Sequence, residues 1–250
     1  MSELSPLAAA GFGAGAAAYD RGRPEYPEAV GRWLGERLRL GPDAVVVDLA
    51  AGTGKLTRVL AATGARVMAV EPVEAMRDAL RRALPGVPVI AGLAESIPLA
   101  DGSLDMVSVG QAFHWFSGER AVAEIARVLR PHGALAIVFN RRDAEQRIQA
   151  QLGKIMEARR GSAPRHVDRA WQVALERSPL FELIGEQRVR NEQVLDTERL
   201  IDRVVSVSYI AALPSDQRAQ VAAEVRGVAD SYSSPLVLRY ITESLLFGRT

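Results

Sequence analysis

The stretch "VVVDLAAGTGK", from Val45 to Lys55, places an acid and two glycines directly after a short apolar run. Asp48 lies at the end of that run, and Gly52 and Gly54 follow among small residues. Glycine lets the main chain turn sharply and approach a ligand closely. Adenine nucleotides, dinucleotides and S-adenosylmethionine all dock against turns of this kind, so the neighbouring residues must decide among three chemistries.

A phosphate-binding loop for nucleoside triphosphates has the pattern G-x-x-x-x-G-K-[ST]. The pair Gly54-Lys55 matches its end. The first glycine of the pattern is replaced by Leu49, and the magnesium-binding hydroxyl is replaced by Leu56. The sequence therefore excludes this loop.

A dinucleotide fingerprint, G-x-G-x-x-G, fits in part. Gly52 and Gly54 match, Thr57 stands in place of the third glycine, and Glu71 lies about where a ribose-binding acid is expected. A nicotinamide-dependent oxidoreductase therefore stays open as an alternative. Asp48 argues against it, because an acid ahead of the glycines would repel a pyrophosphate. The same acid would suit a zwitterionic sulfonium ligand that carries an ammonium group.

The elements around this turn alternate regularly between strand and helix patterns. Apolar, strand-like runs occupy 44–50, 65–71, 87–92, 104–112 and 134–140, with helical periodicity between them. Such alternation predicts a parallel sheet with helices on both faces. Ligands of these sheets bind beyond the carboxyl ends of the strands, which is where the glycine turn lies.

The rhythm changes after Asn140. Helical patterns cover 143–178, 197–212 and 215–231, and strand-like patterns cover 181–195 and 236–250. We predict an α/β fold, a Rossmann-like seven-stranded, mostly parallel sheet with a helical roof over the substrate side. One domain spans 1–250: a lead-in and first helix in 1–43, a cofactor-binding core in 44–140, and the roof with the last two strands in 141–250.

The composition is that of an ordinary globular protein, 48% hydrophobic and 24% charged with a formal net charge of +1. This balance favours neither a nucleic-acid nor a membrane surface as partner. There is no cysteine, which excludes disulfides and thiolate metal sites and is compatible with a reducing compartment. The segment "LSPLAAAGFGAGAAAY" is a poor signal peptide and too short to span a bilayer. We expect residues 1 to about 18 to be a flexible lead-in and the protein to be cytoplasmic.

Several segments together resemble the class I S-adenosylmethionine-dependent methyltransferases. "VVVDLAAGTGKLTRVLA" is similar to the first motif of the family and "MAVEPVEAM" to the second. "AESIPLADGSLDMVSVGQAFHWF" is similar to the third motif and the region of the fourth strand, and "EIARVLRPHGALAIV" to the region of the fifth strand, in the family's order and spacing. "AAAYDRGRPEYP", "HWF" and "VVSVSYIAALP" further resemble a small-molecule subgroup that includes trans-aconitate methyltransferase-like proteins. The resemblance implies S-adenosylmethionine as cofactor and a small-molecule acceptor.

The chain departs from the family pattern at two positions. Ala50 stands where the first motif usually has a glycine, which is tolerable only if its φ angle is negative and the ligand does not press on it. Leu93 follows Gly92 where an acid is often found, so the adenine amino group would be left to Glu95 or to backbone carbonyls.

The resemblance implies specific roles for several residues. Glu71 would accept hydrogen bonds from both ribose hydroxyls, or be only an exposed acid at a strand end. Met76 would pack beside the adenine or in the core, and Asp48 would orient the turn or hold the ammonium group through water. Arg23 would pair with the cofactor carboxylate or be solvated. The expected cofactor-binding residues are Tyr19, Arg23, Asp48, Ala50, Gly52, Thr53, Gly54, Glu71, Pro72, Met76, Ala94, Glu95, Gln111 and Ala112.

On the acceptor side, His114 is the candidate catalytic residue, because its ordinary pKa of roughly 6.5 suits proton removal near neutrality. It could equally position the acceptor or cap a helix. Trp115 and Phe116 could line a pocket or the core, and Tyr209 is a candidate pocket residue. A basic segment is either a solvated face or a site for an anionic substrate; its members are Arg159, Arg160, Arg165, His166 and Arg169.

Methyl transfer by in-line displacement needs alignment and exclusion of water more than an acid or base, so His114 is optional for the chemistry. The three histidines, His114, His132 and His166, are widely spaced and form no metal-ligand pattern. A cofactor-binding protein without catalysis is a second alternative, and methylation of protein or RNA a third. The lack of a basic stripe disfavours RNA. The sequence predicts neither the acceptor and the atom methylated nor the oligomeric state.

Overall fold

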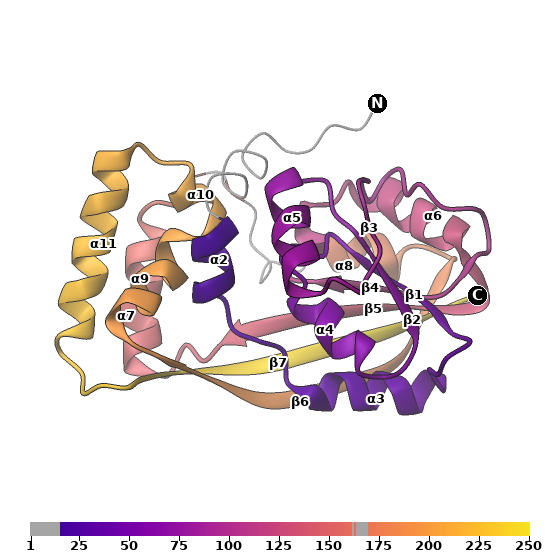
Figure 1. Ribbon diagram of the computed structural model, residues 1–250, viewed down its shortest axis with the longest axis horizontal. Helices are drawn as coiled ribbons and strands as arrows, with labels where there is room; N and C mark the ends of the chain where they lie inside the picture. Colours follow the sequence, from indigo (N-terminus) through magenta and orange to yellow (C-terminus); the bar gives the residue numbers. More distant parts are fainter. Residues whose placement is uncertain (1–15, 162, 164–169) are drawn as a thin grey trace.

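The computed structural model describes residues 16–161, 163 and 170–250, and a seven-stranded sheet forms the centre of this part of the chain. The strands follow the order β3-β2-β1-β4-β5-β7-β6. Strands β1 to β5 are parallel, whereas β7 is antiparallel to both β5 and β6 (Figure 1). The strand bounds are β1 Val45–Leu49, β2 Arg66–Val70, β3 Val89–Ile90, β4 Leu104–Gly110, β5 Leu129–Arg142, β6 Phe181–Leu195 and β7 Leu236–Arg249. The predicted fold class is confirmed.

Two strands differ in length from their sequence patterns. The third is shorter than the predicted 87–92, because only Val89 and Ile90 pair with β2 at the edge of the sheet. The fifth extends beyond the predicted 134–140, because β7 pairs with it as far as Arg142. His132 lies within β5 with a φ of 63°.

The helices that surround the sheet include one for each predicted helical segment. Their bounds are α2 Ala16–Gly22, α3 Glu28–Leu38, α4 Lys55–Ala61, α5 Glu74–Ala83, α6 Gly118–Val128, α7 Arg147–Glu157, α8 Ala170–Glu176, α9 Thr197–Val205, α10 Ser208–Ala211 and α11 Ser215–Ala229. A single 3-10 turn, η1 Phe113–Trp115, follows β4.

Helices cover both faces of the sheet. Adjacent residues of a strand point to opposite faces and are therefore both buried. Val46 of β1 packs in one cluster with residues of α3 and α4. Its neighbour Val47 packs in another cluster with residues of α6 and α8. Helix α8 therefore covers the sheet through Leu175, although its sequence fell within the region predicted as roof.

The roof consists of α7, α9, α10 and α11, which gather over one end of β6 and β7 in Figure 1. Their apolar faces form a separate cluster that includes Leu238 and Tyr240 of β7. Strand β7 accordingly changes its burial pattern along its length. Residues Leu236–Ile241, beneath the roof, alternate between buried and exposed, whereas Thr242–Phe247, inside the sheet, are all buried.

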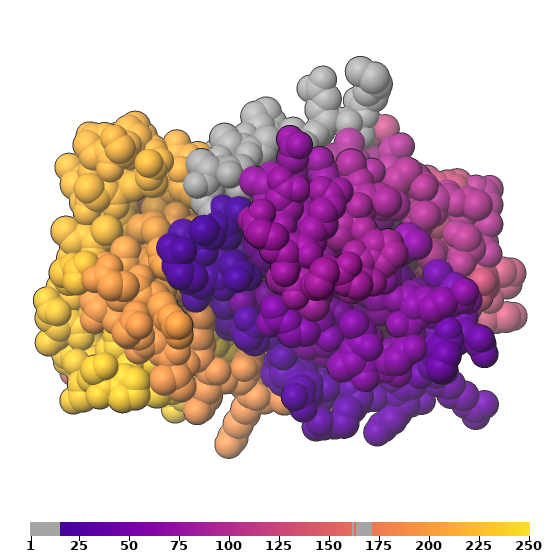
Figure 2. Space-filling model, in the orientation of Figure 1, coloured from indigo at the N-terminus to yellow at the C-terminus, as the bar shows by residue number. Residues whose placement is uncertain are grey.

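Helix α2 joins the roof to the rest of the molecule. Figure 2 shows this helix, in indigo, between the orange and yellow roof and the purple and magenta core. Gly22 lies so close to α9 that a Cβ atom on it would be 2.4 Å from the main-chain nitrogen of Arg203. Arg21 forms an ion pair with Asp202, with 2.7 Å between Nε and Oδ2. Residues 16–18, expected in a flexible lead-in, are thus helical, while residues 1–15 lie outside the described residues.

Candidate active site

The turn after β1 contains three residues in the left-handed region: Ala50 (φ 54°), Gly52 (58°) and Gly54 (90°). The expectation that Ala50 would need a negative φ was wrong, and an alanine in this region costs roughly 1–2 kcal/mol. Hydrogen bonds hold the turn in place: Ala51 donates to the Val70 carbonyl at 3.3 Å, and Gly54 to the Ala51 carbonyl at 3.0 Å.

Asp48 is fully buried beneath this turn. Its Oδ2 accepts a hydrogen bond from the Thr57 hydroxyl at 2.6 Å, and its Oδ1 accepts one from the Ser108 hydroxyl at 2.9 Å. Burial raises the pKa of Asp48 to about 6, and the two hydroxyls partly offset that rise. The carboxylate therefore ties β1 to β4 and α4, which is the turn-orienting arrangement, and Thr57 at the third fingerprint position has a structural reason.

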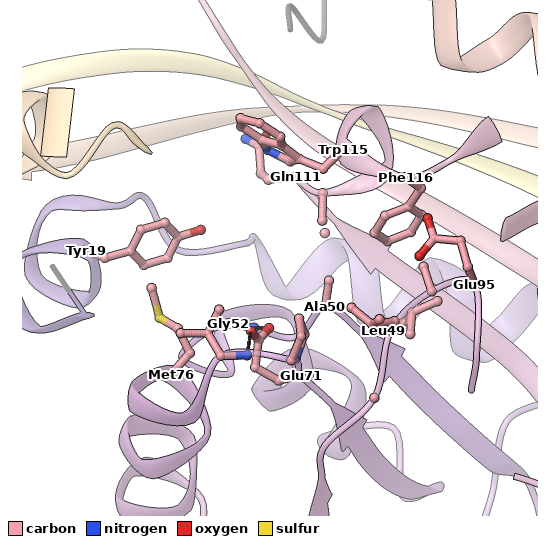
Figure 3. A pocket seen from close by; sticks show the side chains of 17 residues that line it. Tyr19, Leu49, Ala50, Gly52, Glu71, Met76, Glu95, Gln111, Trp115 and Phe116 are labelled. Carbon is pink, nitrogen blue, oxygen red and sulfur yellow. Dashed lines mark hydrogen bonds between the residues drawn. The ribbon is translucent and has the colours of Figure 1, made fainter. Parts of the chain in front are cut away.

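Glu71 lies at the end of β2 and is only 5% exposed, so it is not a solvated acid. Its Oε2 accepts from the Gly52 N–H and its Oε1 from the Val73 N–H, both at 2.9 Å. Burial raises the pKa of Glu71, against the effect of these backbone donors. Each oxygen retains acceptor capacity toward the adjoining cavity, since a carboxylate has about four lone-pair sites. Figure 3 shows the bond between Gly52 and Glu71 on the cavity floor.

The strand-end cavity, as we name it, lies beyond the carboxyl ends of β1, β2 and β4. Figure 3 shows Tyr19 and Met76 on one side of it and Phe116 and Glu95 on the other. Met76 is 2% exposed and packs in the core, and it also lines the cavity. The expected cofactor-binding residues found on its wall are Tyr19, Ala50, Gly52, Glu71, Pro72, Met76, Ala94, Glu95, Gln111 and Ala112. The carboxylate of Glu95 accepts from the Ser117 N–H at 2.6 Å, so it is partly engaged at the start of α6.

A second hollow, the Asp48 cavity, adjoins the first and shares Tyr19, Ala50, Gly52 and Gln111 with it. It adds Arg23, Asp48 and Thr53 from the expected set. Gly54 is not among the residues that line either cavity. The absence of a side chain at Gly54 serves packing, because a Cβ atom there would lie 2.9 Å from the Leu80 side chain.

Lys55 is a wall residue of the Asp48 cavity that the sequence analysis did not single out. This lysine is 8% exposed and pairs with Glu25, and its Nζ lies 3.7 Å from Asp20. The Thr53 hydroxyl donates to Asp20 at 2.8 Å. Together these contacts fasten α2 and the segment after it to the glycine turn.

Arg23 is packed against protein groups, so the alternative of a solvated arginine is wrong. It stacks over the Tyr19 ring at 4.8 Å, and its Nη2 donates to the Ser206 carbonyl at 3.1 Å. Burial, followed by the charge of Arg203, lowers the pKa of Arg23 to about 10. The side chain lies in the wall between the Asp48 cavity and a third hollow.

That third hollow, the arginine cavity, is lined by Arg23, Arg142, Arg160 and Arg203 and lies under the roof. The expected acceptor-side residues His114, Trp115 and Tyr209 also line it, whereas Phe116 lines the strand-end cavity. The His114 ring, in η1, lies with its centroid 6.1 Å from that of Phe139.

Among the described residues of the basic segment 159–169, Arg160 lines the arginine cavity, and Arg159 pairs with Glu224. Arg165, His166 and Arg169 lie outside the described residues. The sequence analysis did not identify Arg142 and Arg203 as residues of this cavity. Arg142 ends β5, where the strand-end rule applies, and Arg203 is a lone cation on the apolar face of α9, beside Leu200 and Val204.

The fold and this site define a methyltransferase of Rossmann-like fold, and the comparisons with known proteins agree. A methyltransferase domain family matches residues 47–137. The chain is 40% identical over 238 residues to an uncharacterized methyltransferase of Mycobacterium tuberculosis, covering 92% of each chain. It is 35% identical over 217 residues to an uncharacterized methyltransferase-like protein of Schizosaccharomyces pombe, covering 84% of this chain and 82% of the other.

A solved structure of a type II methyltransferase candidate from Anaeromyxobacter dehalogenans is similar with a TM-score of 0.64 at 26% identity, covering 91% of this chain and 97% of the other. The chain belongs to the class I S-adenosylmethionine-dependent methyltransferases, and it is an enzyme of that family. This favours methyl transfer over the nicotinamide-dependent and non-catalytic alternatives.

Two further observations concern what the described part of the chain could bind. Within residues 16–161 and 170–250, every helix is too short or too polar to cross a membrane. Among the described side chains, no group of three or more histidine, aspartate and glutamate residues is placed to hold a metal ion.

Proposed function

We propose that this chain binds S-adenosylmethionine across the strand-end and Asp48 cavities, with the adenosine part in the first and the methionine part in the second. The observation that carries the placement is Glu71, a buried carboxylate held by Gly52 and Val73 with its remaining acceptor sites toward the cavity. Ribose offers two neighbouring hydroxyl donors, which match a fixed carboxylate. Arg23, which lines the Asp48 cavity, is suited to the cofactor carboxylate.

We propose that the acceptor is a small molecule in the arginine cavity. This cavity adjoins the Asp48 cavity at the residues that line both, Tyr19, Arg23, Gln111, Asn140 and Arg203. S-adenosylmethionine, when bound, supplies a methyl group that its sulfonium makes electrophilic. The chain would align the acceptor atom opposite the sulfur and exclude water under the roof. Such alignment can contribute about 7–11 kcal/mol to lowering the barrier.

His114 lines the same cavity, and we propose that it positions the acceptor or removes its proton. Gln111 is held between the cavities, since its Nε2 donates to the Asn140 carbonyl at 3.0 Å and its φ is 59°. A cytoplasmic location, with no nucleic acid or membrane as partner, stays part of the proposal; it is supported by the near-neutral charge and the absence of cysteine.

Ligand binding tests this function directly. S-adenosylhomocysteine should raise the melting temperature and release heat in a titration, whereas NAD should do neither. Heat with NAD and none with S-adenosylhomocysteine would overturn the proposal. For the acceptor side, His114→Ala should lower the rate and remove an acidic limb from the pH–rate profile if the ring acts as base; an unchanged profile would assign it positioning alone.

A further inference from the structure

The arginine cavity holds a concentration of positive charge that the described residues do not balance. Its four arginines come from distant segments, and no carboxylate is found among the described residues that line it. Arg160 has an acidic partner, since its Nε lies 2.8 Å from Glu157. Arg23, Arg142 and Arg203 have no carboxylate partner among the described residues. Three buried or half-buried cations thus face one cavity.

The groups that these cations do contact are neutral. The Arg142 Nη1 lies 3.4 Å from the Met156 sulfur, a weak acceptor. The Arg203 Nε donates to the Tyr240 hydroxyl at 3.0 Å, and its guanidinium lies 5.9 Å from that ring. The Arg203 Nη1 and the Arg23 Nε are buried with no hydrogen-bond partner in the described structure. Each guanidinium therefore retains donors that are not used.

Unpaired buried cations are strongly unfavourable, and arginine cannot relieve the cost by losing its proton. Burial lowers the pKa of Arg142, and the charge of Arg203 lowers it further. Arg203 has the same effect on Arg23. Arg203 therefore repels both Arg23 and Arg142. A group that brings negative charge into the cavity would relieve both the repulsion and the missing hydrogen bonds.

The cofactor cannot supply this charge. S-adenosylmethionine carries one carboxylate, one ammonium and one sulfonium, so it is a net cation. Its single carboxylate could neutralise only one of Arg23 and Arg203, which both line the Asp48 cavity and the arginine cavity, and it would not reach Arg142, which lines the arginine cavity alone. Neither the cofactor nor the described lining residues supply enough negative charge, so the acceptor is the group we consider as its source.

We propose, on the basis of the cofactor placement above, that the acceptor is a small organic dianion whose charged groups pair with Arg142 and Arg203. A guanidinium offers paired donors that fit a carboxylate or a phosphate, so a dicarboxylate and a phosphate monoester share this chemistry. Arg203 lines both the Asp48 cavity and the arginine cavity, so an anion that it holds lies next to the methionine end of the cofactor. The hydroxyls of Ser208 and Tyr209 line the same space and offer further donors.

The test is isothermal titration of protein saturated with S-adenosylhomocysteine. The probes are glutarate, glycerol 3-phosphate and glutaramide, the uncharged diamide that matches glutarate in shape. We expect at least one of the two dianions to bind at least tenfold more tightly than glutaramide, and which of them binds identifies the charged group. If neither dianion binds more tightly than glutaramide, the proposal is overturned.

Two variants separate a binding role from a general charge effect. Arg142→Met should weaken binding of the dianion at least tenfold. Arg141→Met is the matched control, because Arg141 is adjacent on β5, points to the other face of the sheet and pairs with Glu243 at 3.2 Å. Equal affinity in Arg142→Met and the unmodified protein would refute the role of Arg142.

Two further measurements, the melting temperature of the Arg142 variant and the binding of S-adenosylhomocysteine, distinguish this proposal from a structural role of Arg142 and from a failure of the cofactor placement. Because Arg142 lacks an acidic partner, Arg142→Met should not lower the melting temperature without ligand, whereas removal of a structural arginine would lower it. Failure of the cofactor placement would show as absent binding of S-adenosylhomocysteine. Failure of the present inference would show as intact binding of S-adenosylhomocysteine together with indifference to the dianions.

Discussion

The cofactor side, formed by the strand-end and Asp48 cavities, and the arginine cavity lie next to each other but treat buried charge in opposite ways. On the cofactor side, Asp48 and Glu71 both have hydrogen-bond donors for each carboxylate oxygen. In the arginine cavity, Arg142 and Arg203 lie against neutral groups. The first region is organised by bonds within the chain. The second is electrostatically incomplete without a ligand.

This difference teaches which part of the enzyme is fixed in advance. The hydrogen bonds of Asp48 and Glu71 join neighbouring strands, so the glycine turn is in place before the cofactor arrives. Such preorganisation lowers the entropy lost on binding. The arginine cavity instead gains its stabilisation when an anion enters, so selectivity for charge is built into that region.

The largest expected effect is on the free energy of unfolding, and it tests whether ionisation of the buried Asp48 destabilises the protein. The pKa of Asp48 is raised from 3.8 to about 6, so its contribution to stability is full below pH 3.8 and is lost as pH rises through 6. From pH 3.5 to pH 7.5 the free energy of unfolding of the unmodified protein should fall by about 3 kcal/mol relative to Asp48→Asn. Urea unfolding of both proteins across this range measures the difference. A constant difference would mean that the hydroxyls of Thr57 and Ser108 fully compensate burial.

A comparable or smaller effect is expected for the ligand contact on the same side. Glu71→Ala should weaken S-adenosylhomocysteine binding by one to two orders of magnitude, since hydrogen bonds to a charged group are worth about 1.5–3 kcal/mol. Titration calorimetry measures this loss. The control is Glu74→Ala, which removes an exposed acid on α5. Unchanged affinity in a folded Glu71→Ala protein would refute the ribose role and leave Glu71 only its bonds to Gly52 and Val73.

The smallest effect concerns strain in the glycine turn. Because Ala50 has a φ of 54°, Ala50→Gly should raise the free energy of unfolding by about 0.5–1 kcal/mol. Ala51→Gly is the control: Ala51 is outside the left-handed region, so the added flexibility should lower stability by a similar amount. Denaturant unfolding of both variants decides, and equal losses in the two would show that Ala50 carries no strain.

The cofactor side was largely predictable from sequence because it is assembled from the ends of consecutive strands. Asp48 lies near the carboxyl end of β1, Gly52 follows β1, and Glu71 follows β2. Parallel pairing brings the carboxyl ends of these two strands together. The sign of φ at Ala50 could not be predicted, since the turn is set by main-chain bonds to β2 that no local pattern encodes.

The arginine cavity was largely missed because its members have no common sequence neighbourhood. Arg142 was beyond the predicted end of its strand, and its position depends on pairing with β7, far along the chain. Arg203 reaches the cavity from α9, which packs closely against α2 at Gly22. The basic segment 159–169 predicted a site for anions, and of its described members Arg160 lines the arginine cavity.

The two-part burial pattern of β7 has a consequence for engineering chimaeras with relatives. Leu238 and Tyr240 enter the roof cluster, and Leu246 enters the cluster beneath the sheet, along one uninterrupted strand. Inserting or deleting a single residue between Tyr240 and Leu246 would turn the buried side chains at one end of the strand to the opposite face of the sheet. The region that selects the acceptor therefore cannot be exchanged as a cassette unless the grafted strand preserves this phase.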